Sequence, residues 1–363
     1  MEIGLGLDST LRLSLDEQNQ LCETAVDFGF NSIWTPEGTG QDSYQICLRR
    51  WEATTNIIST GITTGIAVSP VIWRSPMAFA MAGGTVSQIT NGKFIMGLGS
   101  GGIYRPGAMN SLGKSKISAL SLMRDYVTIV RKLVNGETVS YRGKTETLLE
   151  EKLAIFPFPK TPIYLGALGP KMLSLAGELA DGAALNWCNP EQIAWSREQI
   201  KLGAEKSNRD PSEIKISEYI RICVDDEDEN RSRIALAKAT IGYALGPTVP
   251  TEKERQLGYR AHFERMGFSK ELANLDQMRI KGASHDEIAE AFPTNILNTV
   301  GYFGSSEGAA KAFADLSKGL DNAIVRVVSS RPGNINGALD AMKACSPEKI
   351  NQNLYRILQK YGK

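Results

Sequence analysis

The residues best suited to chemistry in this 363-residue chain lie in one short loop, Gly166 to Gly169. The apolar run Ile163-Tyr164-Leu165 before the loop predicts a buried strand, and Pro170 after it is typical of the first residue of a helix. The loop therefore leads to a helix N-terminus, where free N–H groups and the helix dipole attract an anion such as phosphate. A tight turn with a snorkelling Lys171 is the alternative, and the pattern alone does not separate the two.

Carboxylates offer a second kind of chemistry. Asp8 and Glu37 each follow a predicted strand. Glu37 could donate a proton or accept a hydrogen bond from a cofactor ring, and capping of the amides of Thr39 or Gly40 is equally compatible with its position. Two carboxylates could also perform glycoside-type chemistry, but one such pair is expected by chance.

A glycine-rich stretch, Gly97 to Gly102, matches the GxGxxG pattern of dinucleotide-binding proteins. The residues after it, Ile103 to Gly107, are not typical of a helix start, and no acidic strand end follows at the expected distance. A Rossmann site is therefore disfavoured. A glycine wall against a flat ring system fits better, and a plain loop is the alternative.

Composition excludes several function classes. Hydrophobic residues at 42% and charged residues at 22% are typical of a globular protein with an ample core. The net charge of +1 argues against nucleic acid or a membrane surface as the main partner. The chain has only two histidines, His262 and His285, and its five cysteines are dispersed, so no metal site is expected. With no visible signal peptide and no long apolar run, we expect a cytoplasmic protein with reduced thiols.

Alternating strand and helix patterns position these residues. They predict an α/β fold, a (β/α)₈ TIM-like barrel, with a doubly wound sheet as the competing architecture. A charged, mainly helical stretch at about 246–293 interrupts the pattern as an insertion between strands seven and eight. The predicted strands are 2–7, 32–34, 62–68, 94–98, 163–165, 183–185, 214–224 and 323–328. The predicted helices include 15–28, 43–59, 76–89, 116–134, 191–208, 306–316, 336–343 and 347–359.

In such a barrel the loops after the strands form one face, where chemistry gathers. Here those loops are rich in glycine, small hydroxyls and backbone amides, and they hold no histidine. A Ser-His-Asp triad would need the insertion to fold over the barrel mouth. The composition of this face is typical of a site that holds a large cofactor with its own reactivity.

Four stretches resemble the bacterial-luciferase-like superfamily, and most closely its coenzyme F420-dependent branch, which includes methylene-tetrahydromethanopterin reductases. They are Leu165–Gly182, Gly92–Gly99, Gly65–Pro76 and Trp34–Asp42. The resemblance implies one barrel domain over residues 1–363, a homodimer, and a deazaflavin or flavin against a bulge in the third strand. It also implies a non-prolyl cis peptide at Ala67-Val68 and a cofactor phosphate held by Leu168 and Gly169.

These arguments assign a site. Glu37 is the expected catalytic residue. The expected cofactor-binding residues are Glu37, Ala67, Val68, Ser69, Ser100, Gly101, Gly166, Ala167, Leu168, Gly169 and Asn186. Substrate contacts are expected from Tyr104, Arg105, Trp187, Arg221, Arg331 and the insertion, although a core position is favoured for Trp187 over a pocket wall.

Two positions depart from the sugar-phosphate dehydrogenases that the chain resembles. Gly38 stands where those enzymes carry a histidine, and Gly102 stands where they carry a glutamate, so sugar-phosphate oxidation is disfavoured. We therefore expect an F420-dependent oxidoreductase that moves a hydride between the deazaflavin and a small or pterin-like substrate. An FMN-dependent monooxygenase and a non-catalytic F420- or flavin-binding protein are the alternatives. No pattern in the sequence identifies the substrate or the direction of hydride transfer.

Overall fold

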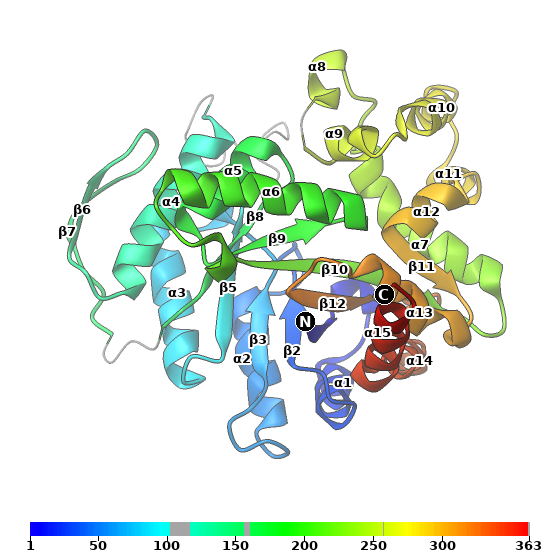
Figure 1. Ribbon diagram of the computed structural model, residues 1–363, viewed down its shortest axis with the longest axis horizontal. Helices are drawn as coiled ribbons and strands as arrows, with labels where there is room; N and C mark the ends of the chain where they lie inside the picture. Colours follow the sequence, from blue (N-terminus) through cyan, green and yellow to red (C-terminus); the bar gives the residue numbers. More distant parts are fainter. Residues whose placement is uncertain (102–116, 156–159, 257, 362–363) are drawn as a thin grey trace. The chain divides into compact units, whose positions relative to one another are not determined.

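The structure is a computed structural model that describes residues 1–101, 117–155, 160–256 and 258–361 (Figure 1). Its strands are β1 (Glu2–Gly6), β2 (Ser32–Thr35), β3 (Thr63–Ile66), β4 (Ser69–Pro70), β5 (Phe94–Gly99), β6 (Val139–Arg142), β7 (Thr147–Glu151), β8 (Ile163–Gly166), β9 (Gly182–Asn186), β10 (Lys215–Val224), β11 (Gly301–Gly304) and β12 (Asn322–Val327). Its helices are α1 (Leu15–Asp27), α2 (Ser43–Thr54), α3 (Pro76–Ile89), α4 (Ala119–Val134), α5 (Pro170–Leu179), α6 (Pro190–Lys206), α7 (Glu229–Ala244), α8 (Glu252–Arg255), α9 (Gly258–Arg265), α10 (Ser269–Ile280), α11 (His285–Glu290), α12 (Thr294–Val300), α13 (Ser306–Leu316), α14 (Ile335–Ala344) and α15 (Pro347–Tyr361).

The fold is the predicted (β/α)₈ barrel. Its eight parallel strands are β1, β2, β3, β5, β8, β9, β10 and β12, with helices around them. The predicted order of strands and helices is confirmed, and the doubly wound alternative is wrong. The ends differ most at α2, which stops at Thr54 instead of continuing to Ser59, and at α4, which begins at Ala119 instead of Lys116. Within the described ranges, no helix is both long enough and apolar enough to cross a membrane.

The chain divides into two compact units. Unit 1 comprises Met1–Phe30, Asn186–Trp195 and Glu218–Lys363, and unit 2 comprises Asn31–Leu185 and Ser196–Ser217. In unit 2 the strands follow the order β2-β3-β5-β8-β9, and the short β4 pairs with β5. In unit 1, β1 pairs in parallel with β12, and β10 pairs in parallel with β11.

Local sequence signals explain the elements of unit 2. The side chain of Ser75 caps α3 by accepting a hydrogen bond from the Ala78 amide at 3.2 Å, and Pro76 opens the helix. Strands β6 and β7 form an antiparallel hairpin that is anchored on α4. Asp125 of that helix accepts hydrogen bonds from the Tyr141 hydroxyl at 2.8 Å and from the Thr145 amide at 2.6 Å.

The insertion between the seventh and eighth barrel strands is confirmed as mainly helical, and it extends further than predicted. It contains helices α8 to α12 and ends in β11, a strand that the sequence did not indicate (Figure 1). Although its composition is charged, Phe263, Leu272 and Phe292 pack with Leu236 of α7 in one buried cluster. The charged residues also contribute to this interior, because Arg260 and Asp276 form a buried ion pair at 2.9 Å.

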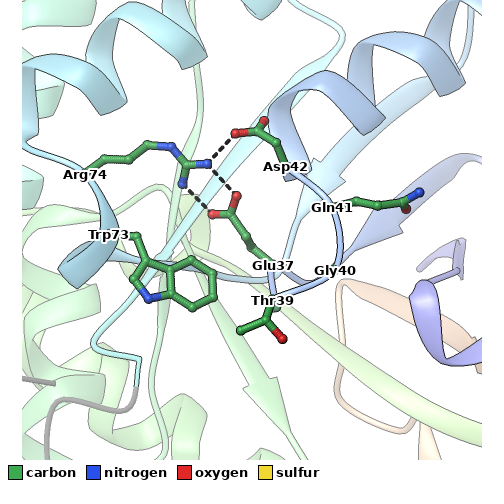
Figure 2. A pocket seen from close by; sticks show the side chains of 8 residues that line it. Glu37, Thr39, Gly40, Gln41, Asp42, Trp73 and Arg74 are labelled. Atoms are coloured by element: carbon green, nitrogen blue, oxygen red, sulfur yellow. Dashed lines mark hydrogen bonds and ion pairs between the residues drawn. The ribbon is translucent and has the colours of Figure 1, made fainter. Parts of the chain in front are cut away.

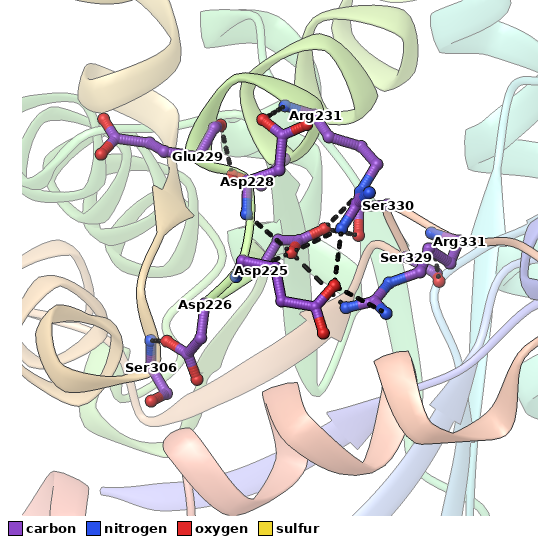
Figure 3. A network of polar contacts seen from close by, with 11 residues as sticks. Asp225, Asp226, Asp228, Glu229, Arg231, Ser306, Ser329, Ser330 and Arg331 are labelled. Carbon is purple, nitrogen blue, oxygen red and sulfur yellow. Dashed lines mark hydrogen bonds and ion pairs between the residues drawn. The ribbon is translucent and has the colours of Figure 1, made fainter.

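The acidic run after β10 does more than begin a helix (Figure 3). Asp228 caps α7 by accepting a hydrogen bond from the Arg231 amide at 3.0 Å, which is the solvated helix start that the sequence predicts. Asp225, in contrast, has a fully buried carboxylate. It accepts hydrogen bonds from the Arg231 guanidinium at 2.6 Å and from the Ser330 hydroxyl at 2.7 Å. Arg331, predicted to contact substrate, lies 3.5 Å from this carboxylate.

This network predicts acid-sensitive stability. The hydrogen bond from Arg231 lowers the pKa of Asp225, so ionised Asp225 stabilises the fold above the carboxyl's ordinary pKa of about 4, and this contribution is lost as the pH falls through the folded-state pKa. We expect Asp225→Asn to lower the free energy of unfolding at pH 7 by about 2–3 kcal/mol, because a buried charge pair loses one partner. We also expect the variant to lose less stability than the natural chain when the pH is lowered. Urea unfolding between pH 7 and pH 3 measures both effects.

Asp228→Asn is the matched control. Asparagine caps a helix about as well as aspartate, so this variant should stay within about 0.5 kcal/mol of the natural chain. Equal stabilities of the Asp225 and Asp228 variants at pH 7 would show that the buried network contributes nothing.

Candidate functional site

The carboxylate of Glu37, the predicted catalytic residue, accepts hydrogen bonds at both of its oxygens within unit 2 (Figure 2). It lies in the loop after β2, and its side chain is 2% exposed. Both carboxylate oxygens accept from the Arg74 guanidinium at 2.6 Å, in the bidentate geometry that makes such pairs strong. The Ser69 hydroxyl donates to Oε2, and the Ser43 amide donates to Oε1 at 3.2 Å. The amides of Thr39 and Gly40, which were candidates for capping by Glu37, are not its partners.

Arg74 also forms an ion pair with a second carboxylate and contacts two aromatic rings. Its Nη2 lies 2.5 Å from Asp42, which also caps α2 by accepting from the Tyr44 amide. The guanidinium stands over the rings of Tyr44 and Phe79, at 5.2 Å and 5.6 Å from their centroids. The hydrogen bond to Glu37 raises the pKa of Arg74, so the guanidinium keeps its charge. Arg74 lies within the stretch Gly65–Pro76, and no pattern in the sequence indicated its pairing with Glu37.

A pocket of about 390 Å³ opens beside this pair (Figure 2). Its lining combines the carboxylates and guanidinium with the half-exposed ring of Trp73 and the loop from Gly38 to Gln41. A Cβ atom added at Gly38 would meet nothing within 4 Å, so this side of the pocket stays open. The pocket therefore offers a fixed anion, a fixed cation and an aromatic face to a small molecule.

The bulge after β3 lies where the resemblance places it. The Ala67-Val68 peptide bond is cis. The Ala67 amide donates to the Thr35 carbonyl at 2.9 Å, and the Val68 carbonyl accepts from the Glu37 amide at 3.3 Å. The next residue, Ser69, begins β4 and donates to the Glu37 carboxylate. Three predicted cofactor-binding residues and the predicted catalytic residue are thus brought together within unit 2.

The glycines of β5 and β8 have a packing role. A Cβ atom at Gly99 would overlap the Val68 side chain, and one at Gly97 or Gly166 would lie 3.2–3.3 Å from it. Gly101 adopts a φ of +58°, and a Cβ there would lie 2.7 Å from Pro70. The glycines therefore make room for Val68 and Pro70, and their service as a wall for a flat ring stays a prediction. Ser100 and Gly101 follow the end of β5, whereas Gly102, Tyr104 and Arg105 lie outside the described residues.

The predicted phosphate loop leads into α5 as expected. Gly169 is the N-cap residue of α5 without a side-chain cap, Pro170 follows it, and a Cβ at Gly169 would meet nothing within 4 Å. The Ala167 amide, however, donates to the Ala184 carbonyl at 3.2 Å, so this N–H is engaged within the barrel. The Met172 amide donates to the Gly169 carbonyl at 3.1 Å and Pro170 has no N–H, so the loop can offer an anion the amides of Gly169 and Lys171, but not those of Ala167 and Met172.

Asn186, at the end of β9, belongs to a polar group in unit 1. Its Oδ1 accepts from Arg221 of β10 at 2.7 Å, and its Nδ2 donates to the Tyr259 hydroxyl at 2.8 Å. The Arg221 guanidinium also stacks on Trp187, 3.4 Å from the ring centroid. Trp187 is fully buried, so the core interpretation of this ring is correct, and it nevertheless supports a polar site.

A second group in unit 1 is electrically neutral. Burial lowers the pKa of His262 to about 4 and raises the pKa of Glu218 to about 8, so both side chains are uncharged at pH 7. The Nε2 atom of His262 lies 2.7 Å from the Trp187 carbonyl and 3.7 Å from the Cys188 thiol. The Glu218 carboxyl accepts from the Cys188 amide. Burial also raises the pKa of this thiol, so the group is not an activated cysteine nucleophile.

Other predicted candidates have structural partners. Asp8 caps the turn Ser9–Leu11 and is paired with Arg326, which leaves it poorly suited to glycoside chemistry. In the part of the chain that the structure describes, no group of three His, Cys, Asp or Glu side chains is placed to hold a metal ion.

Comparison with known proteins gives the family of this chain. The profile of luciferase-like monooxygenases matches residues 3–322. A 5,10-methylenetetrahydromethanopterin reductase of Archaeoglobus fulgidus is 25% identical over 333 residues, which cover 90% of this chain and 93% of the relative.

Two solved structures show the same fold. The coenzyme F420-dependent tetrahydromethanopterin reductase of Methanopyrus kandleri has a TM-score of 0.71 at 21% identity, with 95% of this chain and 97% of that chain covered. An F420-dependent secondary alcohol dehydrogenase in complex with an F420–acetone adduct has a TM-score of 0.71 at 18% identity, with 96% and 98% covered. Since the family profile spans most of the sequence, the chain belongs to the luciferase-like monooxygenase family.

Proposed function

We propose that this protein is an F420-dependent oxidoreductase that transfers a hydride between the deazaflavin and a small or pterin-like substrate. F420 is supported as the cofactor because the two similar structures are named F420-dependent enzymes and the relative is named a methylenetetrahydromethanopterin reductase. The observation that carries the proposal is the uncapped, open start of α5 at Gly169, which follows directly on the strand whose last residue, Gly166, packs against the bulge at Val68. An anion-accepting helix start after β8 and an apolar bulge after β3, with β5 between the two strands, suit a cofactor with a phosphate and a flat ring.

Different residues would bind the phosphate and the ring of the cofactor. Leu168 and Gly169 would hold the phosphate at the start of α5, while Ala67, Val68, Ser100 and Gly101 would support the ring. When bound, the deazaflavin supplies a carbon that accepts or donates a hydride. Hydride transfer requires mainly correct stacking and distance, so the chain needs to orient the substrate and exclude water more than it needs an acid.

Glu37 would act as a base or hydrogen-bond acceptor. Arg74, Ser69 and the Ser43 amide all donate to its carboxylate and therefore stabilise the anion. Because both oxygens already accept hydrogen bonds, the carboxylate is suited to accept from and orient a substrate group rather than to donate a proton. This role fits oxidation of an alcohol, or orientation of a substrate N–H or O–H group at the pocket.

An FMN-dependent monooxygenase is the second candidate, because the family profile is that of luciferase-like monooxygenases. The two functions differ in oxygen chemistry. A reduced flavin reacts quickly with oxygen, whereas a reduced deazaflavin does not, so reoxidation in air separates them.

We also propose a homodimer in the cytoplasm. On unit 2, α3 exposes Met81 by 54% and Ile89 by 46%, and Trp73 just before it is 44% exposed. Exposed apolar side chains on one helix are typical of protein interfaces. All five cysteines are buried thiols, which agrees with a reducing compartment.

The first prediction from this proposal concerns cofactor choice. We expect the purified apo-protein to bind F420 at least about tenfold more tightly than FMN, which corresponds to about 1.4 kcal/mol. Fluorescence titration of both cofactors measures this ratio. A preference for FMN would transfer the proposal to a monooxygenase, and binding of neither would mean that the loop before α5 is only a turn.

The second prediction concerns Glu37. We expect Glu37→Gln to lower kcat about 100-fold in F420-linked turnover, in the range of acid–base contributions, with F420 affinity changed far less. Asp42→Asn, which removes a more exposed partner of the same arginine, should keep most of the activity. Stopped-flow absorbance of the deazaflavin measures the rate, and circular dichroism confirms folding. Equal rates in both variants would remove Glu37 from the mechanism.

The third prediction concerns the dimer. We expect Met81→Glu to convert a dimer into a monomer in sedimentation velocity, because a buried carboxylate at an apolar interface is costly. Leu202→Glu is the matched control, since Leu202 is 58% exposed on α6 of the same unit. If the Met81→Glu variant stays dimeric and the Leu202→Glu variant becomes monomeric, the interface does not include α3.

A further inference from the structure

Arg221 has an unusual environment for a buried cation. Only 5% of the residue is exposed, and it lies near the C-terminal end of β10, where barrel strands deliver functional side chains. The Nη1 atom donates to Asn186 Oδ1 at 2.7 Å and to the Tyr219 carbonyl at 3.2 Å. No carboxylate among the described residues lies within ion-pair distance of its guanidinium, and its Nη2 and Nε atoms have no acceptor there.

A second arginine of unit 1, Arg326, has the carboxylate partner that Arg221 lacks among the described residues. Arg326 of β12 is also buried, and both arginines are close to Tyr219, whose ring lies against Gly6 of β1. Arg326 is paired with Asp8, so its charge is neutralised. Glu218 is the acidic residue nearest to Arg221 along β10, but burial raises the pKa of its carboxyl to about 8 and leaves it mostly protonated. The charge of Arg221 is therefore not compensated by Glu218.

The hydrogen bonds around Arg221 leave a second donor unused. Arginine can only donate, so the atom of Asn186 that faces it must be the oxygen, and the amide NH₂ must face Tyr259. The Tyr259 hydroxyl accepts that hydrogen bond, and its own proton remains available. No acceptor for this proton lies among the described residues. The hydrogen-bonded series Arg221–Asn186–Tyr259 therefore has an unused donor at each end, which are the guanidinium N–H groups of Arg221 and the hydroxyl proton of Tyr259.

We propose that Arg221 and Tyr259 bind an oxyanion, a carboxylate or a phosphate, of the small molecule on which this protein acts. The inference rests on the proposed function and deepens it by assigning the bound molecule an anionic group. Arginine suits such a group because its planar fork matches two oxygens. The stack on Trp187 fixes the guanidinium plane, and Asn186 fixes its rotation, so the donors are oriented before the anion arrives. The competing explanation is that stacking on Trp187 alone satisfies Arg221.

Calorimetric titration of the apo-protein with inorganic phosphate and with acetate, in chloride buffer of constant ionic strength, tests the site. We expect Arg221→Gln to weaken binding about ten- to hundredfold, as for loss of a charged hydrogen-bond donor. Tyr259→Phe removes only one hydroxyl and should weaken binding less, while folding normally. Arg233→Gln is the matched control, because this half-buried arginine of α7 donates to Asn230 and to the Ala289 carbonyl, away from the group.

Titration of the same variants with F420 distinguishes the two sources of the anion. Weaker F420 binding in Arg221→Gln would assign the oxyanion to the cofactor, and unchanged F420 binding would assign it to the substrate. Phosphate and acetate that fail to bind the natural chain, or that bind both site variants as tightly as the control, would overturn the proposal. Anion binding by a chain that does not bind F420 would refute the proposed function and leave this site standing.

Discussion

The packing of Val68 against glycines is the constraint on which the site in unit 2 depends. Its side chain occupies the space that a Cβ atom would need at Gly99 and closely approaches Gly166, while the Ile66 carbonyl excludes a Cβ atom at Gly97, so β5 must be bare at this level. The interior is close-packed, and no other side chain can be added there without moving the bulge. With Val68 fixed, its carbonyl accepts from the Glu37 amide and the following Ser69 meets the Glu37 carboxylate. The position of the carboxylate thus follows from an apolar contact.

Charge is balanced differently in the two polar groups. Around Glu37 the chain supplies hydrogen-bond donors to both carboxylate oxygens, and a pocket opens beside Gly38 and Trp73. Around Arg221 the chain supplies a ring to stack on and an amide oxygen, and no ionised carboxylate. A closed ion pair contributes mainly position, whereas an uncompensated buried cation contributes a field that a ligand can use. The first group is therefore built to hold a geometry, and the second is built to receive charge.

Local patterns made the fold predictable, and long-range pairing limited the prediction of the site. Strand and helix order follows from hydrophobic periodicity, and the starts of α3 and α5 follow from Ser75 with Pro76 and from Pro170. The cis peptide at Ala67-Val68 came from family resemblance alone. The pairing of Glu37 with Arg74 joins residues far apart in sequence, and nothing local in either loop encodes it. Likewise, β11 and the core of the insertion depend on packing against β10 and α7, so a charged composition concealed them.

The departure at Gly38 bears on which substrates the pocket can admit. In the sugar-phosphate dehydrogenases that the chain resembles, a histidine occupies this position beside the carboxylate. Here a Cβ atom at Gly38 would meet nothing within 4 Å, and the adjoining cavity measures about 390 Å³. Replacing an imidazole by a hydrogen removes a proton carrier and adds volume in the same step. With no side chain at Gly38 and a cavity beside it, the Glu37–Arg74 pair can be reached by a group that would clash with a larger residue at this position.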